Sequence, residues 1–280
     1  MLKRFTTLSP QKNMLFLSFL LPLFVMMTIY ATIGVYPFGN SSLLTVDLGQ
    51  QYVDFFSYYR TTLLSDPSAL FFSFTKSFGG EMLGLWAYYL MSPFNLIFLL
   101  FPQSQLPLAV TILILMKIST SGLTFAHLLI SRFEGKGLLV PSFALSYALM
   151  GYVIVNQLNV MWLDGLVFLP LIILGLEKLV SGESGLSYSL FLGVMLISNY
   201  YIGFMICVFL VFYYVFAFSR QEVVGMNNLK AHLKHFFTQS ARFIGYSLLG
   251  AGFAAVLLLP TFYSLLGSKA SYANMLIDWS

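Results

Sequence analysis

The chain has little charge and almost no cysteine. Only 9% of its 280 residues are charged, whereas soluble domains carry about a quarter. A soluble globular fold is therefore excluded, because too few polar side chains are present to cover its surface. The single cysteine, Cys207, lies in an apolar run, which excludes an intrachain disulfide and argues against a redox or zinc role.

Apolar residues take the place of charged ones, at 59% of the chain, and aromatic residues make up 18%. Several apolar stretches reach the ~20 residues that a helix needs to cross the hydrocarbon core of a bilayer. The net charge of +4 does not indicate nucleic acid, because the basic residues cluster in short segments between apolar runs. We therefore predict an all-α integral membrane protein whose main partner is the lipid bilayer, with no nucleic-acid partner.

Basic residues also predict the topology. Short loops rich in Lys and Arg stay in the cytoplasm, which places Arg132, Lys178 and Arg220 inside together with the N-terminus. Residues 85–101, broken by Pro93, then cannot cross and must be re-entrant or lie along the outer surface. Residues 186–218 must form a hairpin that turns near Ser198–Asn199. We expect about seven spanning helices, at residues 14–36, 106–130, 138–155, 160–176, 186–198, 202–218 and 243–266.

One membrane domain accounts for residues 1–280. Its longest loop, residues 37–105, is expected on the extracytoplasmic side and mixes polar with aromatic residues. Aromatic residues are typical of the membrane–water boundary. The loop is therefore predicted to carry interfacial helices, and chemistry is expected on the extracytoplasmic face.

The outer loop contains a segment rich in carboxylates and amides. If residues 47–60 are helical, Gln50, Gln51 and Asp54 lie within one or two turns of Asp47. A carboxylate there can take a proton from an acceptor hydroxyl, and amides can orient a sugar. The alternative is an ordinary solvated loop. The interleaved aromatic residues argue against it, because a solvated loop needs few apolar side chains.

Two further outer turns carry candidate binding residues. The first contains Asn159, Trp162 and Asp164, where Asp164 is either a substrate-positioning group at a helix mouth or a helix cap. The second begins at Ser198 and includes Asn199 and Tyr200. It is either a binding turn or a turn with interfacial tyrosines.

Lys117 falls near the middle of the second predicted span, where an unpaired charge costs about 3 kcal/mol. It needs a partner, and the sequence leaves a lipid phosphate, a carboxylate and backbone carbonyls open. No residue spacing predicts a metal site. His232 and His235 are spaced for chelation but lie in a basic segment that favours a solvated face.

Four short motifs follow one another along the chain and together resemble the YfhO family of bacterial membrane proteins over essentially its whole length. That family is similar to the GT-C superfamily of polyprenyl-phosphate-sugar-dependent glycosyltransferases, and some of its members are implicated in adding sugars to lipoteichoic or wall teichoic acid. The motifs are Asp47-x-x-Gln50-Gln51-Tyr52, Tyr88-Tyr89-x-x-Ser92-Pro93-Phe94-Asn95, Asn159-x-x-Trp162-x-Asp164 and Ser198-Asn199-Tyr200-Tyr201.

The resemblance implies a GT-C-like N-terminal module in which Asp47 is the catalytic carboxylate. It also implies an undecaprenyl-phosphate-type sugar donor and a cell-envelope acceptor such as teichoic acid, and it leaves assistance by a divalent metal open. Family members are much longer, so we expect this chain to be an N-terminal portion lacking its C-terminal part. The candidate substrate-binding residues are Gln50, Gln51, Tyr52, Asp54, Arg60, Lys76, Glu81, Lys117, Asn159, Trp162, Asp164, Asn199 and Tyr200, and Arg60, Lys76 and Lys117 are the cations available for a departing phosphate.

Two other classes of function stay open at this point. A transporter or flippase of a lipid-linked substrate would line its path with Lys117 and Asp164, and predicts internal repeats and paired broken helices that the sequence does not show. A non-catalytic scaffold for envelope assembly would leave the outer carboxylates dispensable.

Overall fold

The computed structural model describes residues 10–76, 78–133, 137–221 and 229–266, and these are overwhelmingly helical. The strands within them, β1 (Phe72–Ser73) and β2 (Gly80–Glu81), form one short antiparallel hairpin. The all-α membrane class predicted from composition is therefore confirmed.

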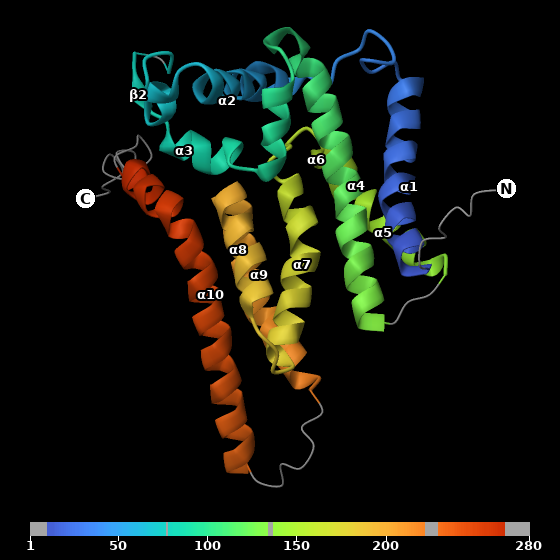
Figure 1. Cartoon of the computed structure of the whole chain (residues 1–280), viewed down its shortest axis with the longest axis vertical. Helices are drawn as coiled ribbons and strands as arrows, with labels where there is room; N and C mark the ends of the chain where they lie inside the picture. The colour runs from blue at the N-terminus through green and yellow to red at the C-terminus, as the bar shows by residue number, and fades with distance from the viewer. Residues whose placement is uncertain (1–9, 77, 134–136, 222–228, 267–280) are drawn as a thin grey trace, which may run out of the picture.

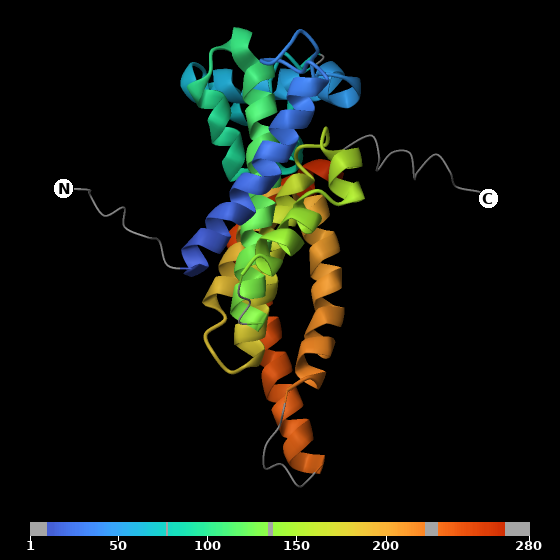
Figure 2. The same ribbon diagram turned by 90° about the vertical axis from the view of Figure 1, so that its right-hand side faces the viewer.

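Each of the seven predicted spans holds helix, and these helices run up and down through the molecule (Figure 1). The last one begins at Leu229 rather than Phe243 and extends past the ends of its neighbours (Figure 2). The helices are α1 (Pro10–Thr32), α4 (Leu106–Phe133), α5 (Leu139–Ala148) with α6 (Gly151–Asn156), α7 (Leu163–Val180), α8 (Leu186–Ser198), α9 (Tyr200–Ser219) and α10 (Leu229–Leu266).

Within the described ranges, 5 of these segments are each long and apolar enough to cross a bilayer, and α7 and α8 are not among them. α7 carries Asp164, Glu177 and Lys178, and α8 has only 13 residues. Both helices contribute many side chains to a buried cluster shared with α9 and α10. A helix buried among other helices needs a less uniformly apolar surface than one that faces lipid, which explains how α7 can carry charge.

Residues 33–76 and 78–105 form a layer of short helices across one end of the bundle (Figure 1), which we call the cap. Its longest helical stretch is continuous, from a π-helical turn into α2. The helical elements of the cap are η1 (Leu48–Tyr52), α2 (Val53–Leu64), η2 (Pro67–Leu70), α3 (Leu83–Leu85), η3 (Trp86–Leu90), η4 (Pro93–Leu100) and η5 (Gln103–Gln105).

The predicted break before Pro93 is present, and the helices on either side of it meet at 94°. Ser92 is extended and its hydroxyl accepts from the backbone N–H of Phe94, so it caps η4. Asn95 donates from its side-chain amide to the carbonyls of Tyr89 and Leu90. These bonds satisfy the backbone that the proline frees.

The ends of α4, α7 and α9 meet at the end of the bundle opposite the cap. Arg132 lies 3.2 Å from the carboxylate of Glu177, to which the Tyr213 hydroxyl also donates. Arg220 lines the same small pocket as Arg132, and α8 and α9 turn at Asn199. The predicted hairpin is confirmed, and Arg132 and Arg220 lie at one end of the bundle, while their placement on the cytoplasmic side stays a prediction.

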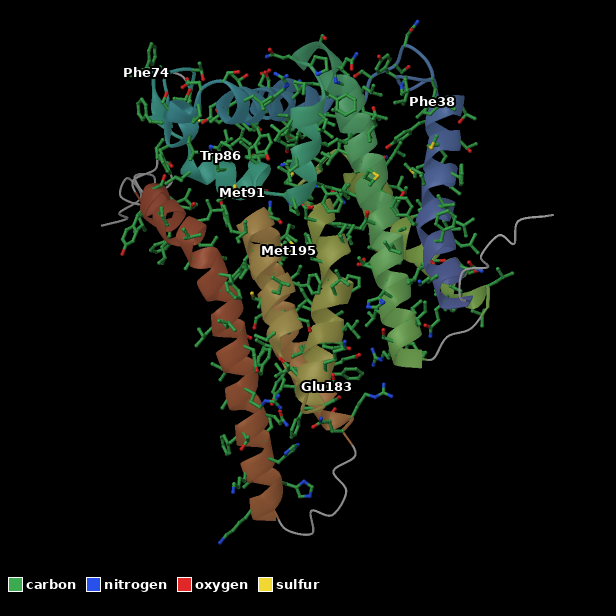
Figure 3. All side chains as sticks on the ribbon, in the orientation of Figure 1. Phe38, Phe74, Trp86, Met91, Glu183 and Met195 are labelled. Atoms are coloured by element: carbon green, nitrogen blue, oxygen red, sulfur yellow. The ribbon has the colours of Figure 1, made fainter. Side chains whose placement is uncertain are left out.

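Side chains fill the boundary between the cap and the bundle, where Trp86 and Met91 lie above the upper ends of the helices (Figure 3). One large buried cluster joins α1, the cap, α4 and the start of α7. The outer faces of α9 and α10 instead expose large apolar side chains such as Phe212 and Val256. Exposed apolar faces of this extent suit contact with lipid.

Candidate functional site

Asp47 stands at the start of the η1–α2 helix with its side chain exposed. The residue before it, Val46, has a φ of 43°, which is strained for a β-branched residue. Residues 44–46 fold tightly over the first helical turn, since a Cβ at Gly49 would collide with the Leu44 carbonyl oxygen. The chain therefore holds this carboxylate in place through a strained and closely packed backbone.

Tyr52 connects Asp47 to a second element. Its hydroxyl is 3.4 Å from the Asp47 carboxylate and 3.2 Å from the side-chain oxygen of Asn159, and it can donate to only one of them at a time. Burial, reinforced by Tyr89 and then Asp47, raises the pKa of Tyr52 to about 12. Tyr52 is therefore a neutral hydrogen-bond donor at physiological pH.

A wall of tyrosines lies next to Asp47. The rings of Tyr52 and Tyr89 are 5.2 Å apart, those of Tyr89 and Tyr88 are 4.6 Å apart, and those of Tyr88 and Tyr200 are 5.7 Å apart. Burial first, and then the nearby Tyr88 and Asp47, raise the pKa of Tyr89 to about 12. The wall offers broad apolar faces with neutral polar tips.

The two outer turns predicted from sequence converge on Tyr88. The indole N–H of Trp162 donates to the Tyr88 hydroxyl at 3.2 Å. The Asn199 amide donates to the Tyr88 carbonyl at 2.8 Å, while its oxygen accepts from the N–H of Ile202 and caps α9. Residues far apart in the sequence thus form one site around this tyrosine.

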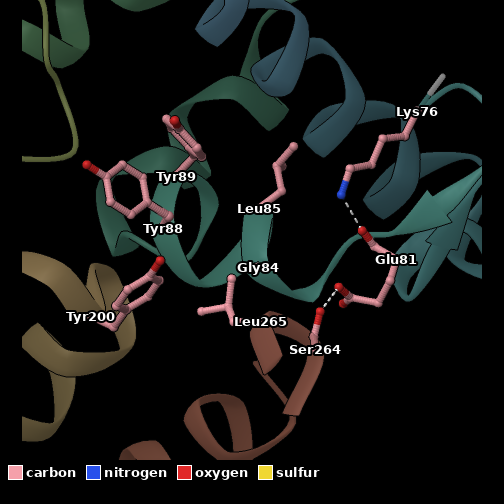
Figure 4. Close-up of a pocket in the computed structure, with 9 residues that line it drawn as sticks. All are labelled: Lys76, Glu81, Gly84, Leu85, Tyr88, Tyr89, Tyr200, Ser264 and Leu265. Carbon is pink, nitrogen blue, oxygen red and sulfur yellow. Dashed lines mark hydrogen bonds between the residues drawn. The ribbon is translucent and has the colours of Figure 1, made fainter. Parts of the chain in front are cut away.

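Part of the tyrosine wall also lines a pocket of about 580 Å³ (Figure 4). Tyr88, Tyr89 and Tyr200 lie toward one end of it, and Lys76, Glu81 and Ser264 lie toward the other. We call it the tyrosine pocket. It combines aromatic faces with one cation and one carboxylate.

The polar end of the tyrosine pocket is ordered by hydrogen bonds. Lys76 donates to the backbone carbonyl of Glu81 at 2.5 Å. The Glu81 carboxylate accepts from the Ser264 hydroxyl on α10 and from the N–H of Leu83. Among the described residues no carboxylate lies within ion-pair distance of Lys76. Its charge is therefore available to an anionic ligand.

Several predicted binding residues lie elsewhere. Gln50, Gln51 and Asp54 are exposed along the η1–α2 helix, beside Asp47 in sequence. Arg60 donates to the Phe101 carbonyl at 2.7 Å and so ties α2 to the end of η4. In this structure Arg60 holds the cap together.

Lys117 and Asp164 form a buried ion pair with 2.9 Å between the ammonium and the carboxylate, and both side chains are inaccessible to solvent. Lys117 also donates to the Val160 carbonyl, and the Ser92 hydroxyl donates to the other oxygen of Asp164 at 2.8 Å. Of the partners that the sequence left open, the carboxylate and the carbonyl are the ones observed. Contact of Lys117 with a lipid phosphate would require this pair to separate.

Sequence reasoning did not select Tyr88, Tyr89 or Ser264 as site residues. Tyr88 and Tyr89 belong to one of the four motifs, so their signal was present but was interpreted as interfacial. Ser264 carried no signal, because its role depends on where α10 ends against the cap. Among the described residues no group of three or more His, Cys, Asp or Glu side chains is placed to bind a metal ion.

Comparison with known proteins gives one finding about the family. Residues 18–280 match the family model described as bacterial membrane protein YfhO. No curated protein and no solved structure matches the chain significantly. The match covers nearly the whole chain, including every element of the site described above.

Proposed function

Because the chain belongs to the YfhO family of bacterial membrane proteins, we propose that it transfers a sugar from a polyprenyl-phosphate donor to a cell-envelope polymer such as teichoic or lipoteichoic acid. One observation carries the proposal. An exposed carboxylate, Asp47, adjoins a tyrosine wall that also lines a pocket holding Lys76, a cation with no carboxylate partner among the described residues. A base and a cation flanking aromatic faces suit a sugar phosphate.

The reaction assigns a role to each group. Asp47 takes the proton from an acceptor hydroxyl as its oxygen forms a bond to the anomeric carbon of the donor sugar. The bond from that carbon to the phosphate oxygen breaks, and the lipid phosphate leaves with the electron pair. Lys76 stabilises the charge on the departing phosphate. Attack from the side opposite the phosphate inverts the anomeric configuration.

The other site residues position these groups. Tyr52 orients the Asp47 carboxylate when it donates to it rather than to Asn159, and Tyr88, Tyr89 and Tyr200 supply faces against which a sugar ring packs. Neutral tyrosines suit this role because they add no negative charge beside the donor phosphate.

The same proposal places the cap on the extracytoplasmic face of the bacterial cell membrane and the N-terminus in the cytoplasm. Arg132 and Arg220 lie at the end of the bundle opposite the cap, and short basic segments favour the cytoplasmic side. Lipid-linked sugars used for envelope polymers must be met on the outer leaflet, so base and donor would share one compartment.

The test is the substitution Asp47→Asn, which removes the base and keeps the shape of the side chain. Transfer should fall by at least ~100-fold. The amount of protein in the membrane should not change, because Asp47 is exposed and makes a single long hydrogen bond. The measurement is the sugar content of envelope polymers in a deletion strain complemented with each variant.

The matched control is Asp66→Asn, which neutralises another exposed aspartate of the cap outside the site. It should restore the sugar content fully. Full restoration by Asp47→Asn as well would remove Asp47 from the mechanism and favour the scaffold class.

A transporter of a lipid-linked substrate is the second candidate, favoured by the ion pair of Lys117 and Asp164 in the bundle. It predicts that purified protein moves lipid between leaflets without forming a glycosidic bond. Transfer by purified protein, lost on Asp47→Asn substitution, would exclude this alternative.

A further inference from the structure

An apolar groove of about 490 Å³ opens between the cap and α10. Its rim is exposed, with Val256 on α10 at 80% and Leu96 on η4 at 56% of their accessible surface. Exposed apolar side chains of this kind suit contact with lipid. Side chains from α2, η3, η4 and α10 line the groove, among them Leu63, Trp86, Leu90, Met91, Leu96 and Val256.

The groove and the tyrosine pocket adjoin each other along two elements, the cap and α10. Along the cap, Leu83 and Trp86 line the groove, while Gly84 and Leu85 between them line the pocket. Along α10, Val256 lines the groove and Ser264 lines the pocket, a separation of roughly 12 Å along the helix axis. The groove therefore lies farther from the cap end of α10 than the pocket does.

Trp86 forms part of the groove wall. Its side chain lines the groove and is only 4% exposed. Its indole N–H finds no acceptor among the described residues. The nitrogen atom is itself buried, so a ligand in the groove contacts the ring and not the N–H.

We propose that this groove binds the first part of the lipid chain of the sugar donor, next to the phosphate, while the phosphate itself lies at Lys76 in the tyrosine pocket. This inference rests on the function proposed above and extends it to the lipid half of the substrate. The ligand must be apolar at one end and anionic at the other, and it must enter from the bilayer. A polyprenyl phosphate has this order of groups.

The size of the groove limits how much chain it holds. Its volume is that of a site for one small molecule, so only a short part of a long isoprenoid fits. The remainder of the chain stays in the bilayer, which the exposed rim at Leu96 and Val256 permits. A protein helix would need a longer and wider surface.

The experiment uses purified full chain in nanodiscs of phosphatidylglycerol with a polyprenyl phosphate that carries a photoreactive group in its first isoprene units. Illumination followed by mass spectrometry of peptides should place the label on the segments containing Leu63, Leu96 or Val256. Unlabelled undecaprenyl phosphate should compete, whereas additional phosphatidylglycerol should not.

Three variants test the site. Val256→Trp fills the groove from α10 and should reduce labelling by about tenfold, whereas the matched control Val215→Trp, on the lipid-facing surface of α9, should label as the wild type does. Lys76→Met removes the cation assigned to the phosphate, and should weaken labelling about tenfold. Equal labelling of Val256→Trp and Val215→Trp, or competition by phosphatidylglycerol, would overturn the proposal.

The outcome is separable from that of the proposed reaction. Asp47→Asn should label like the wild type, because Asp47 lies outside the groove. If Asp47→Asn retains transfer while groove labelling holds, the assignment of the base fails and the lipid site stands. If Asp47→Asn loses transfer while labelling fails, the lipid site alone is wrong.

Discussion

Asp47 in the cap and the pair of Lys117 and Asp164 in the bundle differ in almost every physical respect. Asp47 in the cap is exposed and receives one long hydrogen bond, from Tyr52. Lys117 and Asp164 in the bundle are fully buried and are paired with each other, with the Val160 carbonyl and with the Ser92 hydroxyl. A buried pair whose charges neutralise each other is closed to a ligand in this arrangement, so the difference favours chemistry at Asp47 and a structural role for the pair.

The buried pair also explains how the cap is held. Ser92 belongs to the bend of the cap, and its hydroxyl donates to Asp164. Lys117 is on α4, so a single ionic cluster joins α4, α7 and the cap. The Phe94 ring lies 5.7 Å from the Lys117 ammonium and adds a cation–π contact from the same bend. The pair therefore positions the segment that carries Tyr88 and Tyr89.

The structural role of the buried pair is tested most directly by removing one of its two members. Asp164→Asn or Lys117→Met leaves the other charge buried without a counter-ion, which costs about 3–5 kcal/mol. We expect a large fall in the unfolding temperature of purified protein and loss of the protein from the membrane. The double variant Lys117→Met, Asp164→Leu should recover much of the loss, because neither charge remains.

An opposite result would reverse the interpretation. If Asp164→Asn leaves stability at the wild-type level and abolishes transfer or transport instead, the pair is a functional centre that opens during the cycle. The transporter class would then gain further support, because its substrate path would run past the opened pair.

Composition and charge predicted the architecture well. Apolar runs predict the class and the helical segments. The rule that basic segments lie on one side of the membrane, with an even number of crossings between them, predicts the break before Pro93 and the turn at Asn199. The start of α10 was missed because its first turns are basic and polar, so hydropathy placed the helix boundary at the membrane instead.

The site was predicted only in part. Asp47, Tyr52, Asn159 and Trp162 do meet around the tyrosine wall, but the pairing of Lys117 with Asp164 was not foreseen. Each of these two residues was unusual by itself within its apolar segment, and nothing local indicates which distant partner it meets. Tertiary pairs across 47 positions of sequence depend on helix packing, which single-sequence patterns do not encode.

The role of Asp47 in the cap can be tested further by disturbing the backbone that holds it while leaving the carboxylate intact. Gly49→Ala would drive a methyl group into the Leu44 carbonyl, so the turn that holds Asp47 must shift. A displacement of about 1 Å at a reacting group can cost ~100-fold in rate, and we expect a loss between about 10-fold and 100-fold in transfer. Rates are compared at equal amounts of membrane-inserted protein.

The control for this change is Gly151→Ala, at a glycine where an added Cβ meets nothing within 4 Å. It should transfer at the wild-type rate. Equal rates for both variants would mean that the position of Asp47 is not critical. That result would weaken the assignment of Asp47 as the base, although less than retained transfer in the Asp47→Asn variant would.

The smallest expected effect is on stability at alkaline pH, and it tests the environment of Tyr52 beside Asp47. The pKa of Tyr52 is about 12 in the folded chain against 10.0 for an ordinary tyrosine, so the folded state holds this proton more tightly. Stability should therefore be unaffected below pH 10 and fall as the pH rises from 10 to 12, since the unfolded chain ionises first. Unfolding temperatures measured from pH 8 to 12 should fall less steeply for Tyr52→Phe than for the wild type. Tyr36→Phe, at a tyrosine that is 42% exposed, should follow the wild-type curve; a Tyr52→Phe curve parallel to it would show that Tyr52 is solvated and that the wall beside Asp47 is open to water.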